Sequence, residues 1–246
     1  MNKKLFKPIK FVVGLFLIGS LLVFAPSNVG QRTFGNITGG TSSETQGKTR
    51  GIRGVYLHSG AISSENTAEW VETLKQHGFN GLVINVKNVS GHVTYSSDVP
   101  LVAELSSSIN RLDLESILAD LHEAGIYAIA RLTCFKDPIM ASHCCGGGQW
   151  VDPTSIRARS YNIQIAREVA ELGFDEIQLD YIRYSDGPGQ IGGNYRERSE
   201  VIAGFVEQLR RALPDHVKLS ADVYGRTIWD WNSKNIDPIG QNLEYM

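Results

Sequence analysis

Two aspartates, Asp180 and Asp222, each end an apolar run that has the composition of a buried strand. Asp180 lies within GFDEIQLDYIR, and Asp222 follows VKLSA. A carboxylate in such a place costs free energy unless it has partners or a chemical role. Two carboxylates on neighbouring strands could protonate a glycosidic oxygen and attack or stabilise the cationic sugar, as in glycosidases. The alternative is that each caps a loop or pairs with Arg183 or Lys136.

Other polar residues share the strand parity of the two aspartates. Side chains at alternate positions of a strand lie on one face. One face of each predicted strand is therefore polar towards its C-terminal end, and the other stays apolar and suited to packing under helices. The polar set comprises Tyr56 and His58, Asn85 and Lys87, Arg131 and Thr133, Gln178 and Asp180, and Ser220 and Asp222.

Several residues near these strand ends could bind a polar substrate. Arg131 would need a carboxylate partner if buried, and Asp180 is the nearest candidate. Aromatic rings beside carboxylates suit sugar binding, because a ring face stacks on the apolar face of a pyranose. We therefore predict a substrate-binding set of Tyr56, Lys87, Arg131, Lys136, Asp137, Trp150, Asp152, Tyr181 and Arg183.

A recurring unit positions these residues: an amphipathic helix, a glycine, one apolar and one polar residue, and then an apolar strand. It occurs as HGFNGLVINVK, AGIYAIARLT and LGFDEIQLDY. A strand at GVYLHS precedes the series and one at VKLSADVYG ends it, and the alternation predicts parallel strands joined by right-handed crossovers. The predicted helices are Asn66–Gln76, Leu112–Glu123, Ser155–Glu171 and Arg196–Leu213.

A doubly wound sheet and a (β/α) barrel both fit this order. Polar groups at every strand end favour the barrel, where they converge at the top face. A doubly wound sheet would concentrate them at one switch point, and no GxGxxG follows the first strand. We predict an α/β fold of the (β/α) TIM-barrel type. Such a barrel has eight strands in about 250 residues, so this chain is expected to be truncated after strand 5 of 8, with a last helix starting near Ile239.

The N-terminal residues predict export. Four lysines precede an apolar run from Phe11 to Ala25, which is the pattern of a secretory signal. We predict a signal peptide or N-terminal anchor at 1–27, a flexible linker rich in small and polar residues at 28–50, and a domain at 51–246. The protein would be secreted or extracytoplasmic, with membrane contact only through an uncleaved N-terminal segment. The net charge of −2, without a basic patch, gives no reason to expect nucleic acid.

The three cysteines are Cys134, Cys144 and Cys145. Export permits disulfides. A bond between the adjacent pair, a bond from Cys134 to either, and free thiols are all open. A zinc site is not expected, because no second Cys/His cluster has suitable spacing.

The run from about Arg53 to Gln241 resembles a bacterial family of glycosyl hydrolase-like proteins, domain of unknown function 4015. The resemblance rests on GVYLHSG, INVKNVSGHVTY, GIYAIARLTCFKDP, WVDP, YNIQIAREVAELGFDEIQLDYIRY, LSADVYG and IGQNLE. It implies a TIM-barrel glycosidase, distantly similar to the α-amylase and chitinase types. It also implies that Asp180 stands at the position of an α-amylase-like nucleophile and Asp222 at that of the acid/base.

The chain departs from the family pattern in two places. Asn85, Asn88 and Val89 replace acidic or polar residues of the usual IDVKDDSG, which weakens the case for a contribution from this strand. Gln178 and Ile182 interrupt the chitinase signature DxxDxDxE, which disfavours a chitinase mechanism. The family also continues beyond IGQNLE into further strands.

These observations predict a glycoside hydrolase that acts on an extracellular or cell-wall polysaccharide by two-carboxylate acid/base catalysis. That chemistry requires no cofactor and no metal. The alternatives are a non-catalytic carbohydrate- or cell-wall-binding barrel and an inactive truncated product.

Overall fold

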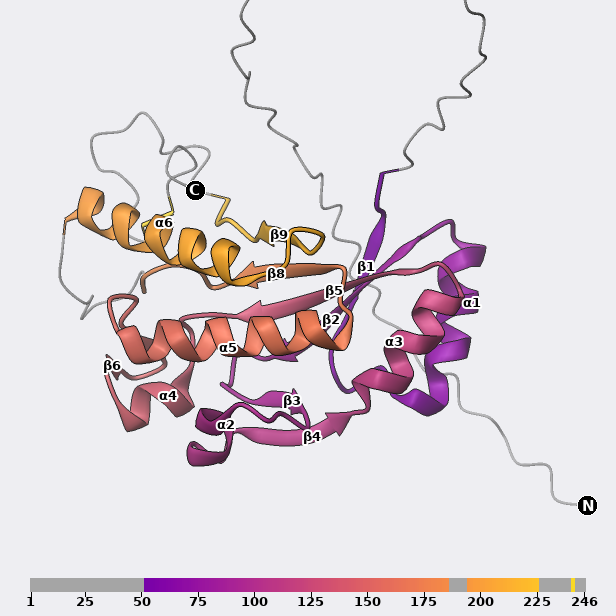
Figure 1. Cartoon of the computed structure of the whole chain (residues 1–246), viewed down its shortest axis with the longest axis horizontal. Helices are drawn as coiled ribbons and strands as arrows, with labels where there is room; N and C mark the ends of the chain where they lie inside the picture. Colours follow the sequence, from indigo (N-terminus) through magenta and orange to yellow (C-terminus); the bar gives the residue numbers. More distant parts are fainter. Residues whose placement is uncertain (1–50, 186–193, 226–239, 242–246) are drawn as a thin grey trace, which may run out of the picture. The chain divides into compact units, whose positions relative to one another are not determined.

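The computed structural model describes residues 51–185, 194–225 and 240–241 of the chain (Figure 1). All of them belong to the compact unit Thr49–Met246. The predicted signal or anchor (1–27), the linker (28–50) and most of the helix predicted near Ile239 lie outside the described residues. No helix among the described residues is long and apolar enough to cross a membrane.

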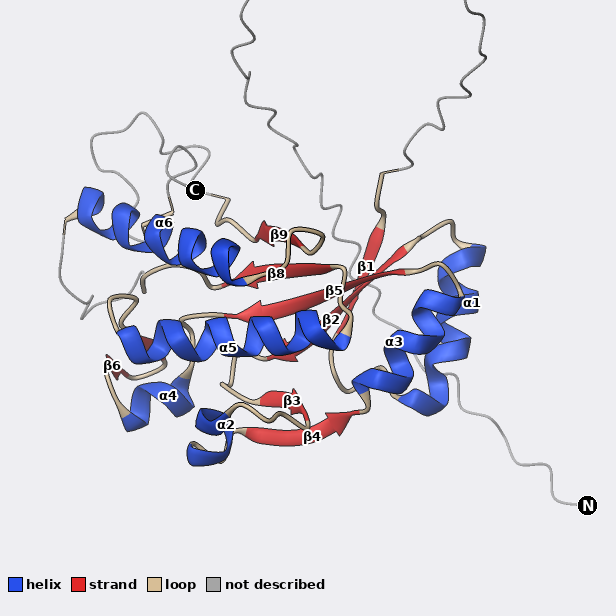
Figure 2. Cartoon of the chain, in the orientation of Figure 1, coloured by secondary structure: helices blue, strands red, loops and turns tan. Residues whose placement is uncertain are grey.

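A mainly parallel sheet forms the centre of the unit (Figure 2). Each of its five parallel strands pairs with the next along the chain, as the sequence predicts. The described strands therefore show no reversal of order, which a doubly wound sheet requires. The order is consistent with neighbouring strands of a (β/α) barrel. The five are β1 (Gly54–Leu57), β2 (Gly81–Lys87), β5 (Tyr127–Thr133), β8 (Glu176–Asp180) and β9 (Lys218–Ala221).

The helices between these strands agree with the predicted ones to within two residues at each end. The long helix α5 packs on β5 and β8 and buries Ile165 and Val169 against the sheet (Figure 1). It ends at Gly173, whose φ of 113° is the left-handed conformation that glycine adopts freely. The helices are η1 (Ser64–Asn66) with α1 (Thr67–Gln76), α3 (Leu114–Glu123), α5 (Ile156–Leu172) and α6 (Tyr195–Ala212).

Two insertions were not predicted. Between β2 and α3 the chain forms a strand antiparallel to β2, a short helix and a further strand, namely β3 (Val93–Tyr95), α2 (Pro100–Glu104) and β4 (Ser108–Leu112). After β5 it forms α4 (Pro138–His143) and a two-stranded hairpin of β6 (Gly146–Gly147) and β7 (Trp150–Val151). These elements are too short to leave a periodic signal in the sequence.

A β-bulge changes the direction of side chains at the end of β2. Asn85 pairs with Arg131, but Lys87 pairs with Leu132, so Val86 is an extra residue in the register. A bulge of this kind moves every later side chain to the other face. Lys87 therefore shares the face of Leu132, which packs under the helices.

Candidate functional site

One side chain from the C-terminal end of each parallel strand joins a single cluster. Arg131 on β5 is its centre. Its Nη1 donates to Asn85 Oδ1 at 2.7 Å, and Asn85 Nδ2 donates to the Tyr56 hydroxyl at 2.7 Å. The Arg131 guanidinium also lies 5.2 Å from the centre of the Tyr56 ring. We call Tyr56, Asn85, Arg131, Asp180 and Asp222 the strand-end cluster.

Arg131 contacts both aspartates. Its Nη2 donates to Asp180 Oδ2, and its Nε lies 3.7 Å from Asp222 Oδ2. The predicted pairing of Arg131 with Asp180 is therefore present, and Asp222 of the same predicted polar face joins it, whereas Lys87 of that face does not. An adjacent guanidinium favours the charged form of a carboxyl group.

Asp180 is held from two sides. Its Oδ1 accepts from the backbone N–H of Tyr181 at 2.6 Å, while Arg131 holds Oδ2. Its carbonyl accepts from Cys134 N at 2.8 Å, so pairing with the chain after β5 continues to the strand's last residue. The side chain is 15% exposed, which leaves it accessible but largely shielded from water.

Asp222 follows β9 and differs from Asp180 in its surroundings. Burial raises the pKa of its carboxyl group, and the nearby Arg131 opposes that shift only in part. Its backbone N–H donates to Leu179 O at 2.7 Å, and its carbonyl accepts from Gln241 Nε2 at 3.2 Å. Gln241, which is buried, also donates to Ile182 O and accepts from Tyr224 N.

The role of Gln241 was missed from the sequence. It links the chain beyond β8 to the chain beyond β9, and so fixes the backbone on which both aspartates stand. Its only signal is that IGQNLE is among the segments shared with the resembled family. A buried amide 17 residues from its nearest partner leaves no local spacing to detect.

A second group of side chains adjoins Asp180, which we call the cation–aromatic cluster: Lys136, Trp150, Tyr181, Arg183 and Tyr224. Lys136 Nζ lies 4.9 Å from the Tyr181 ring centre, and Arg183 Cζ lies 4.6 Å from that of Trp150 and 5.2 Å from that of Tyr224. The Trp150 and Tyr181 rings meet edge to face at 5.7 Å. Four of these residues were predicted to bind substrate, and the structure brings those four together.

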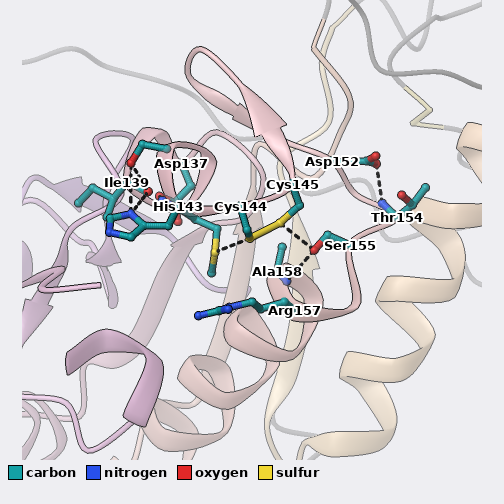
Figure 3. The surroundings of a disulfide bond; sticks show 12 residues. Asp137, Ile139, His143, Cys144, Cys145, Asp152, Thr154, Ser155, Arg157 and Ala158 are labelled. Carbon is teal, nitrogen blue, oxygen red and sulfur yellow. Dashed lines mark hydrogen bonds between the residues drawn. A yellow bond between two sulfur atoms is a disulfide. The ribbon is translucent and has the colours of Figure 1, made fainter. Parts of the chain in front are cut away.

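A disulfide between Cys144 and Cys145 lies at the start of the hairpin that carries Trp150 (Figure 3). The Cys145 carbonyl accepts from Asp152 N at 2.7 Å, and its sulfur accepts from Ser155 Oγ at 3.0 Å. Of the pairings left open by the sequence, the adjacent one is present. Cys134 is free and buried, and burial raises the pKa of its thiol to about 12, which disfavours a nucleophilic role.

Asp152 lies at the base of this hairpin. Its carboxylate accepts from Thr154 N at 2.8 Å, in the turn that leads into α5 (Figure 3). It does not join either cluster through a described contact, although it was predicted to bind substrate. Its observed role is to shape the turn.

Lys87 and Asp137 do not fit their predicted contact with a glycan. Lys87 Nζ lies 2.7 Å from Asp137 Oδ2, and the two side chains are 0% and 1% exposed. The ammonium also donates to Thr133 O and to Asn162 Oδ1 on α5. The β2 bulge accounts for this position, because it turns Lys87 from the polar face to the face under α5. Asp137 in turn caps α4 by accepting from Met140 N.

His58 is exposed and its Nδ1 accepts from Gly60 N, which is a local turn contact. Within the described ranges, no three His, Cys, Asp or Glu side chains are grouped as a metal site would require. The chemistry available at the strand-end cluster is that of two unlike carboxyl groups beside one guanidinium.

Known proteins support a relationship to glycoside hydrolases. A family model, domain of unknown function 4015, matches residues 54–246 and is described as “Putative glycosyl hydrolase domain”. The crystal structure of a hypothetical protein from Ruminiclostridium thermocellum is 33% identical, with a TM-score of 0.62, over 70% of this chain and 98% of that chain. No curated protein matches the sequence.

More distant structures share the fold. The glycoside hydrolase domain of PgaB (BpsB) from Bordetella bronchiseptica is 13% identical, with a TM-score of 0.60, over 78% of this chain and 70% of that chain. The Flavobacterium johnsoniae chitobiase is 14% identical with a TM-score of 0.52, and 69% of this chain covers 31% of the chitobiase. At such identities the likeness concerns the fold alone. By the match over residues 54–246, the chain belongs to the family of domain of unknown function 4015, the “Putative glycosyl hydrolase domain”.

Proposed function

We propose that the domain is a glycoside hydrolase in which Asp180 is the nucleophile or charge-stabilising carboxylate and Asp222 is the general acid/base. The observation that carries the proposal is the position of Arg131, bonded to Asp180 and 3.7 Å from Asp222. Two carboxyl groups with different environments can hold different protonation states at one pH. The family membership supports the reaction class.

The proposed steps use these two environments. Asp222, whose pKa is raised by burial, donates its proton to the glycosidic oxygen as the bond to the anomeric carbon breaks. Asp180 attacks that carbon or stabilises its positive charge. The Asp222 carboxylate then removes a proton from water, whose oxygen completes the hydrolysis at the anomeric carbon. Both carboxyl groups thereby return to their starting states.

The proposed substrate is an extracellular or cell-wall polysaccharide. Tyr181 of the cation–aromatic cluster follows Asp180 directly in the chain, so a sugar bound at this cluster would place its neighbour near the carboxylate. The N-terminal sequence favours export, and we propose that the domain acts outside the cytoplasm. We also propose that its five parallel strands form an arc of a (β/α) barrel, in which strand ends converge on one site.

Two substitutions and two leaving groups test the assigned roles. Asp180→Asn should abolish the hydrolysis of both natural oligosaccharides and dinitrophenyl glycosides, because every substrate needs the attacking or stabilising carboxylate. Asp222→Asn should abolish the former but retain a burst of dinitrophenolate release, since dinitrophenolate departs without protonation and only the later attack of water needs the Asp222 base. Asp120→Asn, at an exposed position on α3, is the matched control. Full activity of either site variant on oligosaccharides would remove that residue from the mechanism.

A glycan-binding domain without catalysis is the second candidate. The observation in its favour is Asn85, a neutral amide inside the strand-end cluster where the family pattern has an acid. Titration calorimetry with the same oligosaccharides separates the two functions. Binding without any turnover by the wild-type protein would support the binding domain.

A further inference from the structure

Lys136 occupies a defined place beside Asp180. It follows β5 by three residues, and its backbone bridges to Trp150. Its ammonium lies 4.9 Å from the centre of the Tyr181 ring, and Tyr181 is the residue directly after Asp180. The ammonium therefore lies over the ring of the residue that follows Asp180 in the chain.

The charge of Lys136 is not matched by an acid. Among the described residues, no carboxylate oxygen lies within 4.0 Å of its ammonium. The other cations of this region differ, because Arg131 is paired with Asp180 and Lys87 with Asp137. Lys136 is half-buried as a residue.

The aromatic contact compensates this cation only in part. A lysine over a tyrosine ring gains about 0.5–1 kcal/mol at an exposed site. An ammonium has three N–H donors, and a ring face satisfies them poorly. The ammonium thus remains able to form a charge-assisted hydrogen bond with an incoming anion.

The surroundings define where such an anion would lie. The negative charge of Asp180 is compensated by Arg131, and Arg183 adds a second cation 5.6 Å from the Tyr181 ring centre. An acidic group on a sugar bound beside Tyr181 would meet the positive charge of Lys136.

We infer that the glycan cleaved by this domain carries an anionic substituent, a carboxylate or a phosphate, and that Lys136 binds it. The inference rests on the proposed function, because it assumes that a sugar stacks at Tyr181 next to Asp180. It makes Lys136 a residue that determines specificity for acidic polysaccharides.

The test uses pairs of glycans that differ only in charge. The carboxylate arm compares oligogalacturonides with their methyl esters. The phosphate arm compares phosphate-bearing cell-wall glycans with the same glycans after dephosphorylation. We expect binding to the acidic member of one arm, weakened about tenfold or more in Lys136→Gln. Lys136→Arg should retain most of the affinity. The affinity of the wild type should fall with salt, and that of Lys136→Gln less so.

Lys218→Gln is the matched control, because Lys218 is exposed at the other end of β9. Equal binding or cleavage of neutral and acidic members by the wild type, unchanged in Lys136→Gln, would overturn the inference and leave the hydrolase proposal intact. Absence of binding to every acidic glycan would also overturn it. Acidic binding that depends on Lys136, without cleavage of any glycan, would support the inference and count against the hydrolase.

Discussion

Tyr181 donates its backbone N–H to the Asp180 carboxylate over 2.6 Å while its own φ is +48°. This left-handed conformation costs a residue with a side chain roughly 1–2 kcal/mol. Strain of this kind often accompanies a functional site, where the surrounding structure enforces it. The relationship suggests that Tyr181 is kept for its effect on Asp180 and for its ring.

The first prediction separates stability from activity at Tyr181. Tyr181→Gly removes the backbone strain and the ring, so the free energy of unfolding should stay within about 1 kcal/mol of wild type. The value of kcat/KM should fall by about tenfold to hundredfold, because the carboxylate and the sugar are less well positioned. Chemical denaturation and kinetics on one preparation provide the comparison. Tyr181→Phe should behave as wild type, and parallel losses of stability and activity in Tyr181→Gly would indicate a purely structural residue.

The second prediction concerns Arg131. Its charge lowers the pKa of Asp222 against the larger effect of burial. Arg131→Met should therefore raise that pKa further and move the alkaline limb of the pH–activity profile to higher pH, because the general acid stays protonated for longer. The value of kcat should fall as well, since Asp180 loses its partner. Arg131→Lys should shift the limb less, and an unmoved limb in Arg131→Met would contradict the assigned acid.

The third prediction follows from linkage at Asp222. Its folded pKa is raised above the ordinary value of 3.8. The folded state therefore binds this proton more tightly than the unfolded chain. The stabilising contribution is fully present below the ordinary value and is lost as the pH rises through the folded value. In acid, Asp222→Asn should have the same Tm as the wild type, and above the folded pKa of Asp222 its Tm should be higher. Thermal melts across pH test this, and a Tm difference that does not change with pH would disprove it.

The fourth prediction concerns the buried Lys87–Asp137 pair. Lys87→Met leaves the Asp137 carboxylate buried without its partner, and the cost should be about 3–5 kcal/mol. The double variant Lys87→Met/Asp137→Leu should recover much of this loss, because it removes both charges. Urea unfolding of the wild type, Lys87→Met, Asp137→Leu and the double variant gives the coupling energy. Additive losses would show that the two charges do not interact.

The fifth prediction concerns the disulfide. It joins adjacent residues and closes almost no loop in the unfolded chain, so Cys144→Ser/Cys145→Ser should change stability little. The KM for the glycan should rise, because the hairpin that holds Trp150 against Tyr181 loses the cross-link at its start. Trp150→Ala should raise the KM similarly, and the two changes should not add. Fully additive increases in KM would show that the disulfide does not act through Trp150.

The sequence was sufficient to predict the parallel order and most of the strand-end cluster. Both depend on the alternation of side chains along single strands, which local sequence encodes directly. Arg131 could be assigned to Asp180 because both lie on the same face at the same strand end. Asn85 was discounted, because its neutral side chain departs from the acidic family pattern, yet it bridges Arg131 and Tyr56.

The errors arise where the structure depends on contacts between distant segments. The bulge at Val86 follows from the pairing of β2 with β5 and has no glycine or proline to mark it. Lys87 was therefore predicted on the polar face of β2, but in the structure it lies on the face under α5. Gln241 and the short strands β3 and β4 have the same origin, since their partners lie elsewhere in the chain.

The bulge also decides how the site could be redesigned. Asn85 and Lys87 are two residues apart, yet one faces Arg131 and the other is enclosed beneath α5. An acidic replacement at Asn85 would add a third carboxylate to the reactive side, where Arg131 can pair with it. The same replacement at Lys87 would oppose Asp137 in a dry interior and unfold the domain. The extra residue Val86 thus places Asn85 where an acidic side chain can be paired and Lys87 where it cannot.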